Sequence, residues 1–230
     1  MRRYDQYCAV ARALDLFGER WTLLVVRSLL MGPLRYTDLR DALPGIATDL
    51  LTTRLRTLED AGYVQRRQLP RPAPATVYEL TPDGWQLGPV VLSLARLGVA
   101  SLGPPAPQDD VNPDALVLLL RASYRATDPA GDPSASYQVG LQLDDEAYCL
   151  DVHPAWVDTR RGPATDPAYT VWTSARTLAE ILSGARPADL AVASGDLELD
   201  GPADELDRFV ACFSFVGAGR SELALTPLPE

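Results

Sequence analysis

The chain has 230 residues, enough for one or two domains that each bury a hydrophobic core. Its hydrophobic fraction of 47% and charged fraction of 23% are ordinary for a globular protein, and no apolar run approaches the roughly 20 residues that span a membrane. The amino terminus lacks the apolar stretch of a secretory signal, so we expect a cytoplasmic protein. Cys8, Cys149 and Cys212 are too scattered for a disulfide framework, which fits a reducing compartment.

The net charge of −10 is divided unevenly along the chain. Residues 1–100 hold 13 arginines and 10 acidic residues, whereas residues 101–230 hold 8 arginines and 21 acidic residues. The second half therefore repels phosphate, while the first half could bind nucleic acid if its arginines cluster. Residues 103–113 are rich in proline and polar residues, and we interpret them as a linker between a domain over 1–102 and a domain over 114–230.

Apolar spacing and Gly/Pro punctuation predict a run of helices and one hairpin in the first domain. Thr81-Pro82-Asp83 is a strong helix start, because threonine caps, proline suits the first position and aspartate favours the positive helix end. The order of helix, Pro44-Gly45 turn, helix and hairpin is typical of a winged helix-turn-helix, a mainly α fold. The predicted helices are Tyr7–Phe17, Glu19–Met31, Arg35–Leu43, Thr48–Ala61 and Pro82–Ser101, and the predicted strands are Tyr63–Leu69 and Thr76–Leu80.

The second domain mixes helices with short strands, which predicts an α+β fold with an antiparallel sheet. Asp144-Asp145 reads as a hairpin turn within an antiparallel meander. The predicted strands are Tyr137–Leu143, Ala147–His153, Trp156–Arg160, Tyr169–Thr173 and Leu197–Leu199, and the predicted helices are Ala115–Ala126, Ala175–Ser183 and Ala203–Phe213.

One helix and the hairpin after it carry the residue types that read DNA. If Leu51, Leu55 and Leu58 face the core, short polar side chains and an arginine lie on the opposite, exposed side. Such groups reach base edges in the major groove, and arginines of a wing contact the backbone or minor groove. The alternative is an ordinary solvated helix face. The candidate DNA-contacting residues are Arg35, Thr48, Asp49, Thr52, Thr53, Arg56, Arg66, Arg67 and Arg71.

Residues 7–100 resemble the HxlR family of bacterial winged-helix regulators. The resemblance is carried by YCAVARALDLFGERWTLLVVRSLLMGPLRYTDLRDALPGIATDLLTTRLRTLEDAGYV and by VYELTPDGWQLGPVVLSLARLG. It implies binding to a pseudo-palindromic operator in double-stranded DNA, by a homodimer paired through the first helix and the helix after the wing. Three positions depart from the family pattern. Ala47 replaces a capping serine, Ala9 replaces a proline, and Leu97 replaces an aromatic residue.

An apolar stripe on the last helix of this domain exceeds what one small core needs, so we expect it to pair two protomers. The alternative is packing within one protomer. The stripe consists of Leu87, Val90, Val91, Leu94 and Leu97.

Cys8 matches a cysteine that some members of the family use to sense electrophiles or oxidants, which makes it a candidate redox sensor. The alternative for Cys8 is a small buried apolar residue.

The segment TVWTSARTLAEILSGARPADLAVASGDLELDGPADELDRFVACFSF resembles the closing part of sterol carrier protein-like lipid-binding domains. The resemblance extends over roughly residues 111–215 and implies an apolar tunnel for a small apolar ligand. Aromatic strand residues could line such a tunnel or form plain core, and no single ligand-binding residue is assigned. These aromatic residues are Tyr137, Tyr148, Trp156, Tyr169 and Trp172.

No catalytic, metal or cofactor site is expected. His153, the single histidine, forms no four-ligand set with Cys149, and no Ser–His–acid pattern or phosphate-binding glycine loop occurs. We therefore expect a dimeric DNA-binding regulator, not an enzyme, with a second domain that senses an apolar or electrophilic small molecule. A lipid carrier that uses the winged helix only for dimerisation is the alternative. An enzyme acting through the acidic domain is the third hypothesis.

Overall fold

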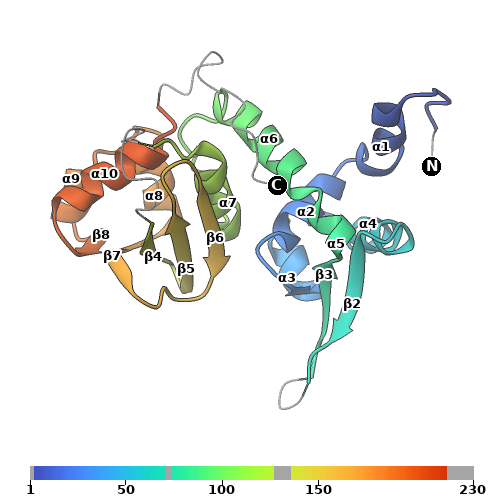
Figure 1. Cartoon of the computed structure of the whole chain (residues 1–230), viewed down its shortest axis with the longest axis horizontal. Helices are drawn as coiled ribbons and strands as arrows, with labels where there is room; N and C mark the ends of the chain where they lie inside the picture. The colour runs from blue at the N-terminus through green and yellow to red at the C-terminus, as the bar shows by residue number, and fades with distance from the viewer. Residues whose placement is uncertain (1–2, 71–73, 127–135, 217–230) are drawn as a thin grey trace. The chain divides into compact units, whose positions relative to one another are not determined.

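The computed structural model describes residues 3–70, 74–126 and 136–216 (Figure 1). The chain forms two compact units, Met1–Val91 and Leu92–Glu230. The division falls inside a helix and not in residues 103–113. The boundaries expected from composition, with domains over 1–102 and 114–230, stay a prediction.

The first unit follows the predicted order of elements, with boundaries shifted by a few residues. It is a winged helix-turn-helix, in which α3 and α4 are the paired helices and β2 and β3 form the wing. Its elements are α1 (Ala9–Phe17), α2 (Thr22–Leu29), β1 (Leu34–Arg35), α3 (Tyr36–Asp41), α4 (Thr48–Asp60), β2 (Val64–Gln68), β3 (Thr76–Leu80), α5 (Pro82–Trp85) and the start of α6 (Gly88–Val99).

A small antiparallel sheet and the faces of α2, α3 and α4 enclose the core of the first unit. Among the described residues the strand order is β1–β3–β2, with Leu34 opposite Tyr78 and Arg66 opposite the same tyrosine from the other side. Strand β1 was not predicted, because two residues are too short to show an alternating pattern. The most buried hydrophobic core residues are Val25, Val26, Leu29, Leu39, Leu43, Leu51, Leu55, Leu58, Val64 and Val77.

The single helix predicted over Pro82–Ser101 is divided into α5 and α6. Pro89 lies in the first turn of α6 and has no N–H to donate to the preceding turn, so a continuous helix would lose a backbone hydrogen bond there. The predicted start is confirmed, because Thr81 Oγ1 accepts a hydrogen bond from the Gly84 N–H at 3.1 Å. The interruption separates the cap from the apolar stripe of α6.

Helix α1 projects from the rest of its unit (Figure 1). Its last residue, Phe17, makes an edge-to-face contact with Tyr63 at 4.9 Å between ring centroids. Ala11 is buried, whereas Val10 is 67% exposed and Leu14 is 43% exposed. A helix this apolar and this exposed has an unfilled face within its own protomer.

The second unit is α+β, as predicted. Its elements are the remainder of α6, α7 (Pro113–Ser123), β4 (Tyr137–Leu143), β5 (Glu146–Val152), β6 (Val157–Arg161), β7 (Pro167–Thr173), α8 (Ala175–Leu182), α9 (Ala188–Ala193), β8 (Leu197–Asp200) and α10 (Asp204–Phe213). The predicted hairpin turn is confirmed, and Asp144 adopts a positive φ of 53° in it. Helix α9 was not predicted.

The sheet of the second unit is antiparallel except at one pair of strands. Over the part of the chain that the structure describes, the order is β6–β5–β4–β7–β8, and β4 runs parallel to β7. The β4–β5–β6 meander is as predicted, whereas β7 crosses over to lie beside β4. Alternate residues of β4, namely Val139, Leu141 and Leu143, are buried at 0–1% exposure, and α7, α8 and α10 pack together by the sheet (Figure 1).

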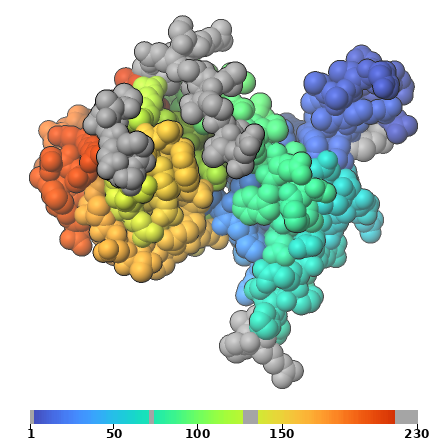
Figure 2. All heavy atoms as spheres, viewed as in Figure 1, coloured from blue at the N-terminus to red at the C-terminus, as the bar shows by residue number. Residues whose placement is uncertain are grey.

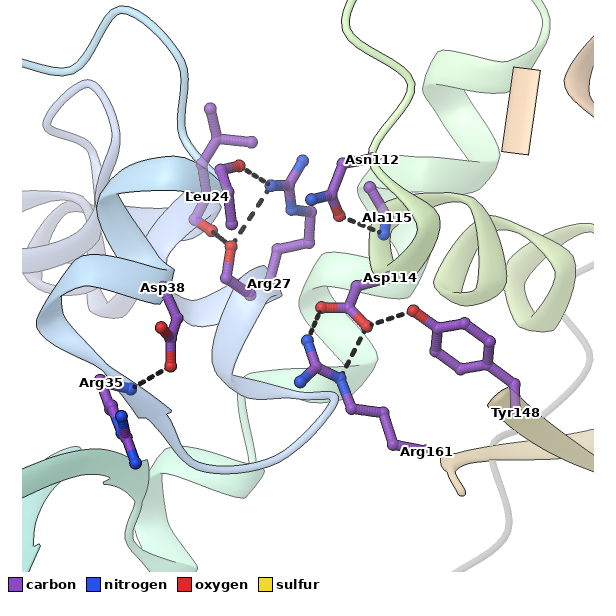
Figure 3. Close-up of polar contacts among 11 residues, drawn as sticks. Leu24, Arg27, Arg35, Asp38, Asn112, Asp114, Ala115, Tyr148 and Arg161 are labelled. Atoms are coloured by element: carbon purple, nitrogen blue, oxygen red, sulfur yellow. Dashed lines mark hydrogen bonds and ion pairs between the residues drawn. The ribbon is translucent and has the colours of Figure 1, made fainter. Parts of the chain in front are cut away.

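A buried carboxylate fastens α7 to this sheet (Figure 3). Asp114 lies in the first turn of α7, and its Oδ1 accepts hydrogen bonds from the Tyr148 hydroxyl and from Arg161 Nε, each at 2.8 Å. A second Arg161 nitrogen, Nη2, donates to Asp114 Oδ2. Burial and the neighbouring carboxylate raise the pKa of Tyr148 far above its ordinary value, so the phenol stays protonated and donates.

The residues expected to form a linker are held by side-chain contacts within the second unit. Arg176 of α8 donates to the Ala106 carbonyl at 3.3 Å and to the Asp109 carbonyl at 2.6 Å. Arg96 of α6 donates to the Ala122 carbonyl at the end of α7 at 2.9 Å. The segment between α6 and α7 is therefore part of the folded unit and not a free tether.

Candidate nucleic-acid interface

Helix α4 begins at Thr48 without a capping side chain. Ala47 occupies the N-cap position and makes no side-chain hydrogen bond, as its identity requires. The hydroxyl of Tyr36, on α3, instead donates to the Thr48 carbonyl at 2.9 Å and lies 3.2 Å from Thr52 Oγ1. Tyr36 therefore fixes the start of α4 against the supporting helix, a role that the sequence reasoning missed.

The exposed face of α4 carries the predicted polar residues. Leu51, Leu55 and Leu58 are buried at 0–1% exposure, as the spacing predicted. Two of the hydroxyls are already bound within the helix, because Thr52 donates to the Thr48 carbonyl at 3.0 Å and Thr53 donates to the Asp49 carbonyl at 2.7 Å. Their methyl groups and lone pairs are what they can offer a base edge. The exposed residues are Thr48, Asp49, Thr52, Thr53 and Arg56.

The two arginines of α4 have different surroundings. Arg54 donates to Glu19 Oε2 at 3.0 Å and to the Arg20 carbonyl at 3.1 Å, and its side chain is only 14% exposed. This places Arg54 in the packing between α4 and the loop before α2. Arg56 is exposed, and no hydrogen bond or ion pair to its guanidinium is found among the described residues.

The first wing arginine is paired with a carboxylate of α4. Arg66 forms a two-pronged contact with Glu59, with Nε to Oε1 and Nη2 to Oε2 both at 2.8 Å. Its guanidinium also lies over the Tyr78 ring at 5.3 Å from the centroid. The hydrogen bond that Arg66 donates to Glu59 raises the pKa of Arg66, because the carboxylate stabilises the charged guanidinium.

The second wing arginine is paired on the opposite face of the hairpin. Arg67 Nε donates to Glu79 Oε2 at 2.8 Å, and Gln65 donates to Glu79 Oε1 at 2.9 Å. The hydrogen bond from Arg67 lowers the pKa of Glu79, which keeps the carboxylate charged. Arg66 and Arg67 are consecutive strand residues and so point to opposite faces.

The other predicted DNA contacts have separate positions. Arg35 is exposed at the start of α3, where its backbone N–H donates to Asp38 Oδ2 at 3.0 Å (Figure 3). Arg71 lies outside the described residues. In the space-filling view the hairpin extends beyond the body of its own unit (Figure 2). The arginines expected to act together are therefore spread over α3, α4 and both faces of the wing.

Partners of these arginines could not be assigned from sequence. Glu59 lies in the last turn of the amphipathic helix α4 and Glu79 lies inside strand β3, where each resembles an ordinary solvated residue. Opposite charges at cross-strand spacing were the available signal for Glu79, since Gln65 lies directly opposite it and Arg67 two residues further. Tyr36 carried no signal beyond its position at the start of α3.

The predicted dimerisation residues fall into two groups. Leu87 and Val91 are 7% exposed and belong to the core of the protomer. Val90, Leu94 and Leu97 are 47%, 48% and 70% exposed and remain available to a second copy. Cys8 is exposed at the N-cap of α1, so it is not the buried apolar residue of the alternative interpretation.

The aromatic residues of the second unit do not share one environment. Tyr148 and Tyr169 are buried at 1–2% exposure, whereas Trp172 is 47% exposed. Trp156 is 40% exposed and stacks on His153 at 3.7 Å between ring centroids. Nothing in these positions assigns a tunnel lining. Within the described residues, no helix is long and apolar enough to cross a membrane, and no group of His, Cys, Asp and Glu could hold a metal ion.

The comparisons with known proteins divide the chain in the same way as its charge does. The family model for the HxlR-like helix-turn-helix matches residues 16–104. The model for the alkyl sulfatase C-terminal region matches residues 128–216, so the expected sterol carrier protein resemblance is not confirmed.

Curated relatives match the first part of the chain. An uncharacterized HTH-type transcriptional regulator of Synechocystis sp. is 40% identical over 91 residues, which is 40% of this chain and 67% of that protein. The uncharacterized regulator YvaP of Bacillus subtilis is 31% identical over 93 residues, which is 40% of this chain and 86% of that protein. The solved structure of reduced YodB from B. subtilis is 30% identical, with 40% of this chain and 92% of that chain covered, at a TM-score of 0.37. Matched from the end of α1 through the winged helix-turn-helix and α6, the chain belongs to the HxlR-like helix-turn-helix family of transcriptional regulators.

Proposed function

We propose that the protein regulates transcription as a homodimer that binds a two-fold symmetric operator in double-stranded DNA. The observation that carries this proposal is Arg56, an exposed and unpaired guanidinium on the outer face of α4 among the described residues. It stands one to two turns from Thr48, Asp49 and Thr52 at the N-terminal end of the helix. This is the part of a recognition helix that enters the major groove.

The exposed apolar side chains of α1 and α6 support the dimer. Val10 and Leu14 on α1 and Leu94 and Leu97 on α6 all have at least 43% of their surface exposed. Two-fold proteins read two-fold sites, so pairing through these helices would present two copies of α4 to one operator. In such a dimer, each Cys8 thiol lies at the N-cap of α1, one of the two pairing helices. An effect of Cys8 oxidation on DNA binding can therefore be tested.

For the second unit we propose a sensing role toward a small apolar molecule. The support for this is the match of residues 128–216 to the alkyl sulfatase C-terminal family model, whose name refers to an alkyl compound. Native mass spectrometry of protein from its own host would reveal a retained small molecule. A mass equal to the bare dimer in every preparation would count against the sensing role.

The decisive experiment is fluorescence anisotropy with a labelled duplex from upstream of the protein's own gene. We expect binding that weakens steeply with salt, because phosphate contacts release counterions. Unlabelled random duplex should compete less well than the specific one. Absence of salt-dependent binding to either duplex would contradict the proposal and favour the carrier alternative, in which the winged helix serves only dimerisation.

A further inference from the structure

The wing of this protein is an unusual phosphate-binding surface, because both of its described arginines already have a carboxylate partner. Arg66 is held by Glu59 through two contacts of 2.8 Å, and Arg67 is held by Glu79 through one of 2.8 Å. The carboxylate side chains are the more buried partners, at 21% and 17% exposure against 55% and 47% for the arginines. The glutamates are therefore fixed, and the arginines lie over them.

A phosphate that approaches either arginine must compete with its glutamate. The two-pronged contact with Glu59 occupies Nε and Nη2 of Arg66, and the contact with Glu79 occupies Nε of Arg67. Moving either guanidinium to a phosphate leaves its carboxylate unpaired. That carboxylate then lies near the phosphate and repels it. The exchange therefore yields less affinity than a free arginine would give.

We propose that Glu59 and Glu79 attenuate the sequence-independent part of DNA binding by holding the two wing arginines. The inference rests on the proposed DNA-binding function and names a regulation of that same surface. Arg56, on the outer face of α4, has no such partner among the described residues and is not attenuated in this way. The free energy of phosphate contacts is the same for every DNA sequence. The two glutamates therefore weaken binding to arbitrary DNA and reduce the amount of protein bound non-specifically along a genome.

The two pairs act separately because they lie on opposite faces of the hairpin. Arg66 packs beside Tyr78 and the end of α4, whereas Arg67 shares its face with Gln65 and Glu79. A hairpin that enters a groove meets phosphates on both faces. Releasing either arginine should therefore strengthen binding, and releasing both should add the two effects.

The test is anisotropy on a labelled random-sequence duplex with Glu59→Gln, Glu79→Gln and the double variant. Each single change is expected to tighten binding roughly threefold to tenfold at moderate salt and to steepen the slope of log K against log salt by up to about 0.9, the value of one added phosphate contact. The matched control is Asp60→Asn, which removes the same charge from an exposed neighbour of Glu59. It should change affinity less than about twofold.

The arginines themselves provide the second test. The gain from Glu59→Gln should disappear in Glu59→Gln/Arg66→Ala, and the gain from Glu79→Gln should disappear in Glu79→Gln/Arg67→Ala. An equal gain in Asp60→Asn, a gain that survives loss of the arginine, or no gain at either glutamate overturns the inference. A gain at one pair alone overturns the role of the other glutamate. If the wild-type protein binds no duplex at all, the proposed function fails instead, so the two failures are distinct.

Discussion

The guanidinium of Arg56 differs from those of nearby arginines in its contacts with carboxylates. Arg54, Arg66 and Arg67 each have a carboxylate within 3.0 Å, and Arg56 has none among the described residues. An arginine with free donors can bind a guanine edge or a phosphate without first giving up a partner. At the scale of single residues, we therefore expect the contribution of each arginine to DNA binding to depend on its pairing more than on its position.

Arg56→Ala should weaken operator binding by about 1–3 kcal/mol, the range for loss of one well-placed arginine contact. Arg66→Ala and Arg67→Ala should weaken operator binding less, because each of these arginines is already paired with a glutamate. Anisotropy titrations at several salt concentrations measure both the loss and the salt slope. Arg160→Ala, which removes one exposed positive charge from the second unit, is the matched control. Equal losses for Arg56 and Arg160 would remove Arg56 from the interface.

The buried carboxylate of Asp114 gives a second prediction at this scale. Arg161→Met leaves Asp114 without its ion pair in a site where its side chain is 7% exposed, and this should lower the free energy of unfolding by about 3 kcal/mol. The adjacent Arg160→Met removes an ion pair with Asp151 in which the side chains are 46% and 33% exposed, and this should cost less than about 1 kcal/mol. Urea denaturation of both variants measures the difference. Similar losses would show that the Asp114 contacts do not hold α7 to the sheet.

At the scale of elements, the residue pattern predicted most of the features that depend on nearby residues, such as helix faces and helix starts. Leu51, Leu55 and Leu58 set the face of α4, and Thr81 set the start of α5, because these depend on spacing and capping within a few residues. The break at Pro89 is also local, but the apolar stripe that continues past it hid the interruption. The parallel pairing of β4 with β7 depends on a crossover between distant segments, which no local pattern encodes.

The candidate interface shows the same division. The exposed residues of α4 followed from helical spacing, whereas the ion pairs of the wing depend on which glutamate the fold brings to which arginine. Arg66 meets Glu59 only because β2 returns along the end of α4. Sequence could place charges on elements, and only the assembled fold decides which of them cancel.

Tyrosines at the C-terminal cap of α7 and on β5 and β7 make the second unit sensitive to alkaline pH. Burial raises the pKa of Tyr124 to about 12 and raises those of Tyr148 and Tyr169 further. An unfolded chain ionises its tyrosines near pH 10, so above that value the unfolded state loses protons that the folded state keeps. Stability is therefore fully present below about pH 10 and is lost as pH rises toward the folded-state values.

The free energy of unfolding should fall by about 1.4 kcal/mol per pH unit for each such tyrosine between about pH 10 and pH 12. Urea denaturation followed by circular dichroism across this range measures the slope. Tyr124→Phe should make the slope shallower, and Tyr7→Phe, at an exposed ring, should leave it unchanged. A flat profile up to pH 11.5 would contradict the burial of these phenols.

On the scale of the whole molecule, the exposed apolar residues of α1 and α6 favour two copies over one. The double variant Leu94→Glu/Leu97→Glu places charge on this face and should give a monomer in native mass spectrometry. Because two linked α4 helices bind one operator far more tightly than one does, operator affinity should fall by roughly a hundredfold. Leu190→Glu, at a leucine that is 57% exposed on α9, is the matched control and should stay dimeric. A dimeric double variant would place the interface elsewhere.

The hydrogen bonds from Arg176 to the carbonyls of residues 106 and 109 affect where the chain can be cut or fused. A protease that favours extended loops should cleave these residues slowly, since their carbonyls are engaged by α8. A cut after residue 102 would separate Arg96 from its partner, the Ala122 carbonyl, and one after residue 91 would sever α6. The acidic half is therefore not a detachable module that could be exchanged at its proline-rich border, and a functional fusion would have to carry α6 along with it.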